Sequence, residues 1–444
     1  MAVEKWTRLY CIDQLTVTHA PRFDVFHLIN HTRLLDRFLR YVKIGSSANP
    51  AATGYPSSPG QWELGRMLHR ELLNMGADDV HQDESGLVWA TIPGTSGTAA
   101  PTIALIAHMD TSPEAPGDDV RPQVIEAYAG GDITLPSGNV MTVGNSPSLS
   151  ELVGKTLITT DGTTLLGGDD KAGVAIIMEV AEHLIERPHI ARGPLRVLFT
   201  CDEEIGRGTD RIDLAKLDSH AAYTIDGGGA GMLDVETFSA DAMRITFTGR
   251  NIHPAIAKGQ MINAVRVACD FVDSLPRTER TPETTDGRDG FIHVHDIRGG
   301  VGKVEVDLIL RSFDEAQLDD FARVVTETAN AAGLSTPIAG EQRVDVQCVR
   351  RKQYRNLAEG LRRVPEVVEL AEKAFANLGR PCVRAIVRGG TDGSQLTEKG
   401  LPTPNLSSGQ HNIHSVLEFA CLEEMVQSAE HAIELLKLWA EKTS

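Results

Sequence analysis

Three consecutive acidic residues, Asp202, Glu203 and Glu204, follow the apolar run LRVLFT after a single cysteine, Cys201. Neighbouring carboxylates repel one another, and a turn after a strand does not require three of them. Most runs of acidic residues are solvated surface, so this triplet alone indicates no chemistry. The triplet becomes informative if other apolar runs in the chain also end in residues that can bind metal or catalyse a reaction.

Two further apolar runs end in side chains that can bind metal. The segment IALIAHMDTSPE places His108 and Asp110 two residues apart, so on a strand they point to the same face. One could then bind a metal while the other orients a ligand. Asp226 ends the run in YTIDGGG, where three glycines allow a close approach of backbone or ligand. Alone, the first pair is a weak signal, and Asp226 is more simply explained by a turn.

Acidic residues also precede a predicted helix. Asp169 and Asp170, in LLGGDDKAG, lie directly before the helix that we expect from about Lys171. A helix N-terminus favours acidic side chains, so capping is the simpler explanation. The later segment SSGQHNIHSVLEF adds His411 and His414, although an isolated loop histidine is usually a surface residue.

Together these residues point to a metal site. They lie at the predicted carboxyl ends of strands in one sheet, where open α/β sheets bind ligands. Oxygen and imidazole ligands without a thiolate suit catalytic zinc, manganese or cobalt. The carboxylates of Asp169, Glu204 and Asp226, with a bound hydroxide, would balance two divalent cations, whereas one cation would leave the carboxylates crowded. The charge count therefore favours two metal ions.

The elements that must position these residues alternate along the chain. The runs GLVWATIPG, TIALIAHMD, LRVLFT and AAYTID predict strands, and the spacing of apolar residues in KAGVAIIMEVAEHLIE predicts a helix with one buried face. Amphipathic helices are also expected near Leu34 and from about Gln61 to Met75. This order predicts an α/β fold with a mixed, largely parallel sheet sandwiched by helices.

The order of elements changes after about Glu236 to β-α-β-β-α-β, which is the ferredoxin-like pattern. Helix–strand alternation resumes with VVELAEKAFANLG, so the sequence predicts a small α+β domain inserted into a larger one. We expect an N-terminal extension at residues 1–30, a catalytic domain formed by 31–235 and 357–444, and an inserted domain at 236–356.

Composition limits the partners of the protein. The chain has 444 residues and a net charge of -18, which disfavours binding to nucleic acid and to anionic membrane surfaces. It has no apolar stretch of the ~18 residues that a membrane span needs. The six cysteines are scattered without a C-x-x-C pair, which is typical of reduced thiols. We therefore expect a cytoplasmic protein.

At the residues described above the sequence resembles the peptidase T branch of the co-catalytic dizinc exopeptidases. That family includes carboxypeptidase G, succinyl-diaminopimelate desuccinylase and aminoacylase. The resemblance covers nearly the whole chain after about Leu34, and its motifs occur in the family's order. They are AHMDTSPE, TLITTDGTTLLGGDDKAG, DEEIGRG, YTIDGGG, NIHPAIAKGQMINA, PETTDGRDGF and VRGGTDGSQLTEKGLPTPNL.

The resemblance implies a set of metal ligands. His108 and Asp226 would hold one divalent ion, Glu204 and His414 would hold the other, and Asp169 would bridge them. Zinc is the expected metal, with cobalt or manganese as alternatives.

The resemblance also implies roles for the remaining residues. Asp110 would brace His108, and Glu203 would be the general base. His253 in NIHPAIAKG and Arg388 in RGGTDG would contact the substrate, with the inserted domain acting as a lid. For Arg388, a structural ion pair with an acid such as Asp392 is the alternative.

The expected function is a metal-dependent aminopeptidase that releases the N-terminal residue from tripeptides in peptide catabolism. An N-acyl-amino-acid hydrolase, a desuccinylase or a broader di- and tripeptidase with the same metals is the alternative. A metal-dependent binding protein without catalysis is disfavoured, because it would not need an unligated Glu203. A homodimer is expected, and whether His253 serves its own or the neighbouring subunit stays open.

Overall fold

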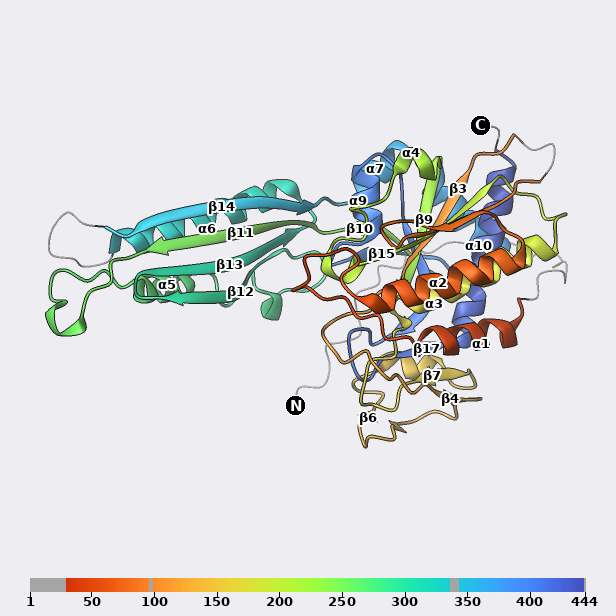
Figure 1. Cartoon of the computed structure of the whole chain (residues 1–444), viewed down its shortest axis with the longest axis horizontal. Coiled ribbons are helices and arrows are strands. Elements are labelled where there is room, and N and C mark those ends of the chain that lie inside the picture. Colours follow the sequence, from red (N-terminus) through yellow and green to blue (C-terminus); the bar gives the residue numbers. More distant parts are fainter. Residues whose placement is uncertain (1–28, 96–98, 336–342, 443–444) are drawn as a thin grey trace. The chain divides into compact units, whose positions relative to one another are not determined.

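The computed structural model describes residues 29–95, 99–335 and 343–442. The described chain divides into two compact units (Figure 1). The smaller unit consists of Glu236–Asn356 and Val387–Gly390, and the larger unit consists of the other described residues. The N-terminal extension expected at residues 1–30 lies outside the described residues except for its last two.

The larger unit is built on a mixed sheet whose centre is parallel. The four strands β8 (Leu195–Thr200), β3 (Ile103–His108), β9 (Ala221–Gly228) and β16 (Asn405–His411) lie side by side in that order and run in the same direction. The strands at both edges pair in antiparallel fashion. These edge strands are β1 (Asp78–Gln82), β2 (Val88–Ile92), β17 (Phe419–Cys421), β7 (Leu157–Thr159) and β4 (Gln123–Ile125). The predicted fold class, a mixed and largely parallel sheet with helices, is therefore confirmed.

Helices cover this sheet. Every residue of β2 and β3 is buried, so both faces of the sheet are covered there. The long helix α3 (Gly168–Glu186) packs against β3, β9 and β16, and it also contacts α10 (Leu422–Ala440). The remaining helices are α1 (His31–Tyr41), α2 (Pro59–Met75), α4 (Leu214–Leu217), α7 (Ala358–Arg363), α8 (Glu366–Asn377) and α9 (Asp392–Glu398). None of the helices that the structure describes is long and apolar enough to cross a membrane.

The structure also contains several short strands and 3-10 helices. The strands β5 (Ile133–Thr134) and β6 (Val140–Met141) form a two-stranded sheet, and β10 (Met232–Thr237) pairs with both β15 (Val383–Val387) and β16. Four short 3-10 helices are η1 (Pro147–Glu151), η2 (Glu203–Ile205), η3 (Pro254–Ile256) and η4 (Pro282–Thr284).

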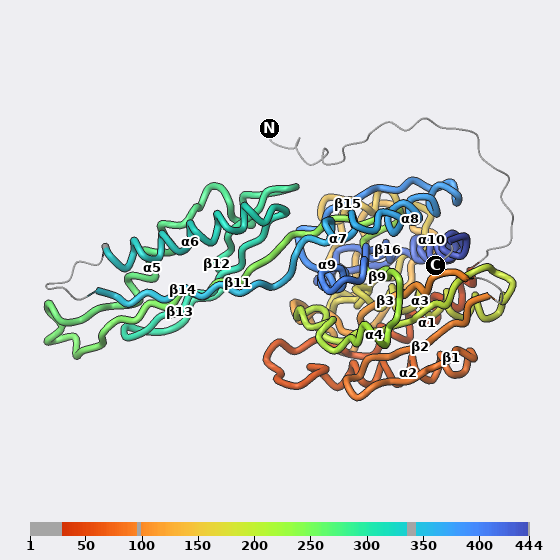
Figure 2. The backbone as a smooth tube through the Cα atoms, turned by 90° about the horizontal axis from the view of Figure 1, so that it is seen from above, coloured from red at the N-terminus to blue at the C-terminus, as the bar shows by residue number. Residues whose placement is uncertain are grey.

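The smaller unit has the predicted ferredoxin-like fold. Its elements follow the order β11 (Ser239–Thr248), α5 (Ala264–Ser274), β12 (Phe291–Gly300), β13 (Lys303–Ser312), α6 (Glu315–Ser335) and β14 (Asp345–Tyr354). The four strands pair antiparallel in the spatial order β12-β13-β11-β14. Both helices lie on one face of this sheet (Figure 2). Along β13, buried residues alternate with more exposed ones, as expected for a sheet covered on one face.

Candidate active site

Three neighbouring parallel strands bring the predicted site residues to one edge of the central sheet. β3 ends at His108, β8 ends directly before Cys201 and the acidic triplet, and β9 carries Asp226 near its end. Because parallel strands end at the same edge, residues far apart in the sequence meet there.

His108 is buried at the centre of this edge, with an exposed fraction of 3%. Its Nε2 atom lies 2.9 Å from Oδ1 of Asp169 and 3.9 Å from Oδ1 of Asp226. Its Nδ1 atom lies 3.0 Å from the backbone oxygen of Asp110 and 3.5 Å from Oδ1 of the same residue. The contacts with Asp110 favour a proton on Nδ1, which makes Nε2 the nitrogen available to a cation.

The carboxylate of Asp169 lies between two histidines. Besides the contact with His108, its Oδ2 atom is 3.3 Å from Nε2 of His414. The backbone at Asp169 and Asp170 is not helical, and the regular part of α3 begins at Lys171, as predicted. Asp169 therefore extends from a loop and not from the helix itself.

Glu204 and His414 form the other side of the cluster. Nε2 of His414 lies 2.9 Å from Oε2 of Glu204, and Nδ1 lies 3.1 Å from Oε2 of Glu114. The Oε1 atom of Glu204 is buried and has no hydrogen-bond partner among the residues that the structure describes. An unsatisfied buried carboxylate oxygen is costly unless a ligand or ion satisfies it.

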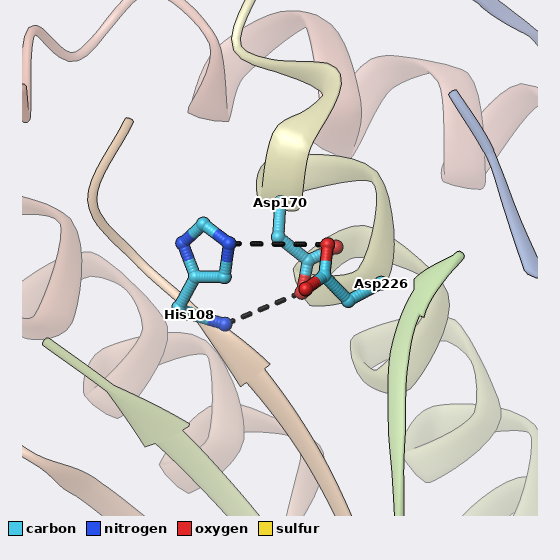
Figure 3. Close-up of side chains that lie close together, drawn as sticks. All are labelled: His108, Asp170 and Asp226. Carbon is cyan, nitrogen blue, oxygen red and sulfur yellow. Dashed lines mark hydrogen bonds and ion pairs between the residues drawn. The ribbon is translucent and has the colours of Figure 1, made fainter. Parts of the chain in front are cut away.

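Asp170 and Asp226 lie together on one side of His108 (Figure 3). Asp170 is fully buried, and its two oxygens accept hydrogen bonds from the backbone N–H groups of His108 at 3.3 Å and Gly173 at 3.1 Å. Asp226 Oδ1 accepts a hydrogen bond from Nε2 of Gln410 at 3.1 Å. Both oxygens of Asp170 are thus engaged by the backbone, whereas Asp226 presents its carboxylate to the imidazole.

Glu203 is adjacent to Glu204 but has a different environment. Among the described residues, its carboxylate accepts no hydrogen bond and forms no ion pair. Its backbone N–H and that of Glu204 donate to Oδ1 and Oδ2 of Asp110, each at 3.1 Å. Asp110 thus contacts His108 and also orients the turn that carries both glutamates.

The electrostatics reflect the crowding of carboxylates. Burial raises the pKa of Glu203 well above its ordinary value, and neighbouring His108 offsets only part of that shift. Burial likewise raises the pKa of Asp226, and the charge of Asp169 adds to the effect. Burial acts to raise the pKa of Asp169 itself, but its hydrogen bonds with His108 and His414 outweigh burial and lower it. The cluster holds more negative charge than its two imidazoles compensate.

The residues present fit divalent cations. Two groups of side chains have potential ligand atoms that all lie within 4.8 Å of one another, namely His108 with Asp170 and Asp226, and His108 with Asp169 and Glu204. The donors are carboxylate oxygens and imidazole nitrogens, which suit zinc, manganese or cobalt. A bound cation would compensate the excess negative charge of the buried carboxylates and would satisfy the free oxygen of Glu204.

Some residues of the site were missed by sequence reasoning. Asp170 was assigned only a capping role, although it holds the backbone of His108. Glu418 was not singled out, yet its carboxylate binds the loop that carries Asp169. The position of Asp170 next to Asp169 in GGDDKAG could have indicated that it belongs to the site. No local pattern distinguishes Glu418 from a surface glutamate.

His253 and Arg388 belong to the smaller unit. His253 is exposed, and its Nδ1 accepts a hydrogen bond from the backbone N–H of Ala255 at 3.2 Å. In the neutral imidazole this bond places the proton on Nε2, so His253 presents a hydrogen-bond donor.

Arg388 forms no ion pair with any described residue. Its guanidinium donates to the backbone oxygens of Gly287 and Asp289, each at 2.9 Å, and to Oγ1 of Thr285 at 2.9 Å. Asp392 belongs to the larger unit, where it accepts a hydrogen bond from Oγ1 of Thr200 at 3.0 Å.

Comparison with known proteins places the chain in a family. Residues 235–337 match the family described as "Peptidase dimerisation domain" (M20_dimer). Peptidase T of Geobacillus thermodenitrificans is 44% identical over 414 residues, which cover 93% of this chain and 99% of that protein. The crystal structure of aminopeptidase PepT from Bacillus cereus is similar with a TM-score of 0.70 and 22% identity, covering 93% of this chain and 100% of that one. A tripeptidase from Staphylococcus aureus gives a TM-score of 0.70 at 23% identity, covering 94% and 100%.

The fold, the inserted ferredoxin-like domain that matches a peptidase dimerisation domain and the carboxylate–imidazole cluster are those of a metal-dependent peptidase. The near-complete match to curated relatives is more specific. The chain belongs to the peptidase T family.

Proposed function

We propose that the protein is a metal-dependent aminopeptidase that releases the N-terminal residue from tripeptides. The observation that carries this proposal is the half-buried Glu203, whose carboxylate is unpaired among the described residues and which lies on the turn next to the candidate metal-binding cluster. A protein that only bound metal would not need it. The relatives named peptidase T supply the substrate class.

We assign the metal ligands from the geometry and the family resemblance. His108 and Asp226 would hold one ion, and Glu204 and His414 would hold the other. Asp169 would bridge them, in keeping with its place between both imidazoles. Zinc suits these donors best, with cobalt or manganese as alternatives.

Asp170 is the weaker candidate for a ligand. Both of its oxygens already accept backbone hydrogen bonds, so binding a metal would require breaking at least one of them. Asp170 instead holds His108 in place.

The chain's own residues would act as follows. When bound, two divalent ions would polarise the scissile carbonyl and lower the pKa of the attacking water. Glu203 takes a proton from that water as its oxygen bonds to the carbonyl carbon, and then donates the proton to the leaving nitrogen as the C–N bond breaks.

The smaller unit would supply substrate contacts. Nε2–H of His253 would donate a hydrogen bond to the developing oxyanion, and the unit would act as a lid that closes over the substrate. The guanidinium of Arg388 would bind the C-terminal carboxylate of the peptide and so select its length. The match to a peptidase dimerisation domain supports a homodimer, and a cytoplasmic location is part of the same proposal.

A substrate panel tests the proposal. Tripeptides, dipeptides and N-acyl amino acids should be assayed side by side, with and without a chelator, using Glu203→Gln as the inactive control. We expect release of the N-terminal residue from tripeptides, loss of activity on chelation, and recovery on adding zinc. A preference for N-acyl amino acids, or activity that survives complete metal removal, would contradict the proposal.

A further inference from the structure

Glu418 connects the two loops that carry candidate metal ligands. It directly precedes β17, which pairs with β16, so it ends the hairpin loop that contains His414. Its side chain is buried, with an exposed fraction of 1%. The loop that carries Asp169 lies 249 residues earlier in the sequence, and the Glu418 carboxylate joins the two loops.

The carboxylate accepts three backbone hydrogen bonds from that earlier loop. Oε2 accepts from the N–H groups of Leu166 and Gly167, both at 2.8 Å, and Oε1 accepts from the N–H of Asp169 at 3.0 Å. Charged acceptors make stronger hydrogen bonds than neutral ones, so these contacts define the course of the loop.

Two glycines adapt the loop to the carboxylate. Gly167 has a φ of +83°, in the left-handed region that glycine adopts without strain. A Cβ atom on Gly168 would lie 3.1 Å from Oε1 of Glu418, so a side chain there would crowd the carboxylate. The two glycines therefore allow the backbone of the loop to lie close to the Glu418 carboxylate.

We propose that Glu418 is a positioning residue that holds Asp169 in place to bridge two metal ions. The inference rests on the proposed two-metal site. Glu418 fixes the backbone of Asp169 from the same loop that carries His414, and Nε2 of His414 lies 3.3 Å from Oδ2 of Asp169. One side chain therefore sets the relative position of a ligand on each loop.

A simple cap of α3 is the competing explanation. A cap would stabilise the folded protein with or without metal and would not change metal affinity. A positioning residue reduces the reorganisation that metal binding requires, so its loss weakens the affinity of the folded protein. Loss of an outer partner of a metal ligand commonly lowers affinity by about 10- to 100-fold.

The test is metal titration of Glu418→Gln. The amide keeps the shape of the side chain, but it replaces one acceptor oxygen with an NH2 group that faces a backbone N–H. Glu423→Gln is the matched control. Glu423 lies at the start of α10, and its Oε2 also accepts a hydrogen bond from a backbone N–H group, that of Thr156, at 2.8 Å. Zinc binding to each metal-free protein should be measured by calorimetry, with folding verified by circular dichroism.

We expect Glu418→Gln to weaken zinc binding by about 10- to 100-fold while Glu423→Gln matches the wild type. Equal affinity in a folded Glu418→Gln protein would overturn the inference. Failure of the proposed function looks different, since the wild type would then bind no metal or would bind it without hydrolysing peptides.

A second measurement uses only the wild type and covers the case in which the variant does not fold. Hydrogen exchange should show the amides of Leu166, Gly167 and Asp169 already protected in the metal-free protein. If these amides exchanged freely until zinc was added, the metal and not Glu418 would order the loop, and the inference would be wrong.

Discussion

The backbone N–H of Glu203 donates a hydrogen bond to Oδ1 of Asp110, 3.1 Å away. The other oxygen of Asp110 accepts from the N–H of Glu204 at the same distance. One buried carboxylate therefore orients the turn on which the proposed general base and a proposed metal ligand stand side by side. This arrangement explains how adjacent glutamates can have different roles, because the turn directs their side chains separately.

Glu203→Gln should reduce kcat for tripeptides by about 10²- to 10⁴-fold, which is the usual contribution of a general base. The amide is isosteric but cannot accept the proton of the attacking water. Metal content, measured by atomic absorption, should equal that of the wild type, because Glu203 is not a proposed ligand. A variant that kept wild-type kcat would refute the assignment of the general base.

Arg388→Ala should lower kcat/KM for tripeptides by roughly 10- to 100-fold, the loss expected for a charge-assisted hydrogen-bonded pair. The guanidinium has no carboxylate partner among the described residues, and it lies over the rings of Phe238 and Phe291, 5.1 and 5.8 Å from their centroids. Its two terminal nitrogens donate hydrogen bonds to neutral oxygens of Gly287, Asp289 and Thr285, and a substrate carboxylate would have to replace some of these bonds. The positive charge has no counter-ion among the described residues, and an anionic substrate group would supply one.

A substrate change provides the control for Arg388. Amidating the C-terminus of the tripeptide should cause a similar loss with the wild type but little further loss with Arg388→Ala. Independent, multiplying effects of the mutation and of amidation would show that Arg388 does not bind the carboxylate.

His253→Ala and Glu203→Gln proteins should each be nearly inactive alone, and we expect their mixture to recover activity after subunit exchange. If His253 serves the neighbouring subunit of a homodimer, a mixed dimer has one complete site. Random exchange would then restore roughly a quarter of the wild-type activity, since half of the dimers are mixed. No recovery, despite exchange demonstrated by native mass spectrometry, would place His253 in the site of its own subunit.

Acid should destabilise the protein through His431. This histidine is buried, with an exposed fraction of 1%, and burial lowers its pKa from 6.5 to about 4. Below pH 6.5 the unfolded chain gains a proton at this residue that the folded protein does not, so the free energy of unfolding falls between pH 6.5 and pH 4. The full difference is about 3 kcal/mol for a shift of this size.

His431→Gln should remove this part of the pH dependence while keeping a donor for the backbone oxygen of Ala371, which lies 2.9 Å from Nε2. Urea unfolding at pH 7 and pH 5 measures the effect, with the exposed His189→Gln as the control. If His431→Gln lost as much stability as the wild type on acidification, another group would be responsible.

The sequence alone predicted the alternation of strands and helices and the inserted ferredoxin-like segment, and it indicated His108, Asp169, Glu204 and Asp226 as candidate metal ligands, whereas the role of His414 came from the family resemblance. Apolar periodicity and turn residues are local properties. His108, Glu204 and Asp226 lie at or near the ends of predicted strands, and Asp169 lies directly before a predicted helix. Their locations could therefore be predicted without tertiary contacts.

Tertiary structure decided which of these groups touch and what holds them. Asp169 lies between His108 and His414 because parallel strands bring loops from distant parts of the chain to one edge. Asp170 binds the backbone of His108, and Glu418 binds that of Asp169. Such contacts join side chains to backbone groups 60 to 250 residues away, and no local pattern encodes them. They form only when packing places the partners within hydrogen-bond distance.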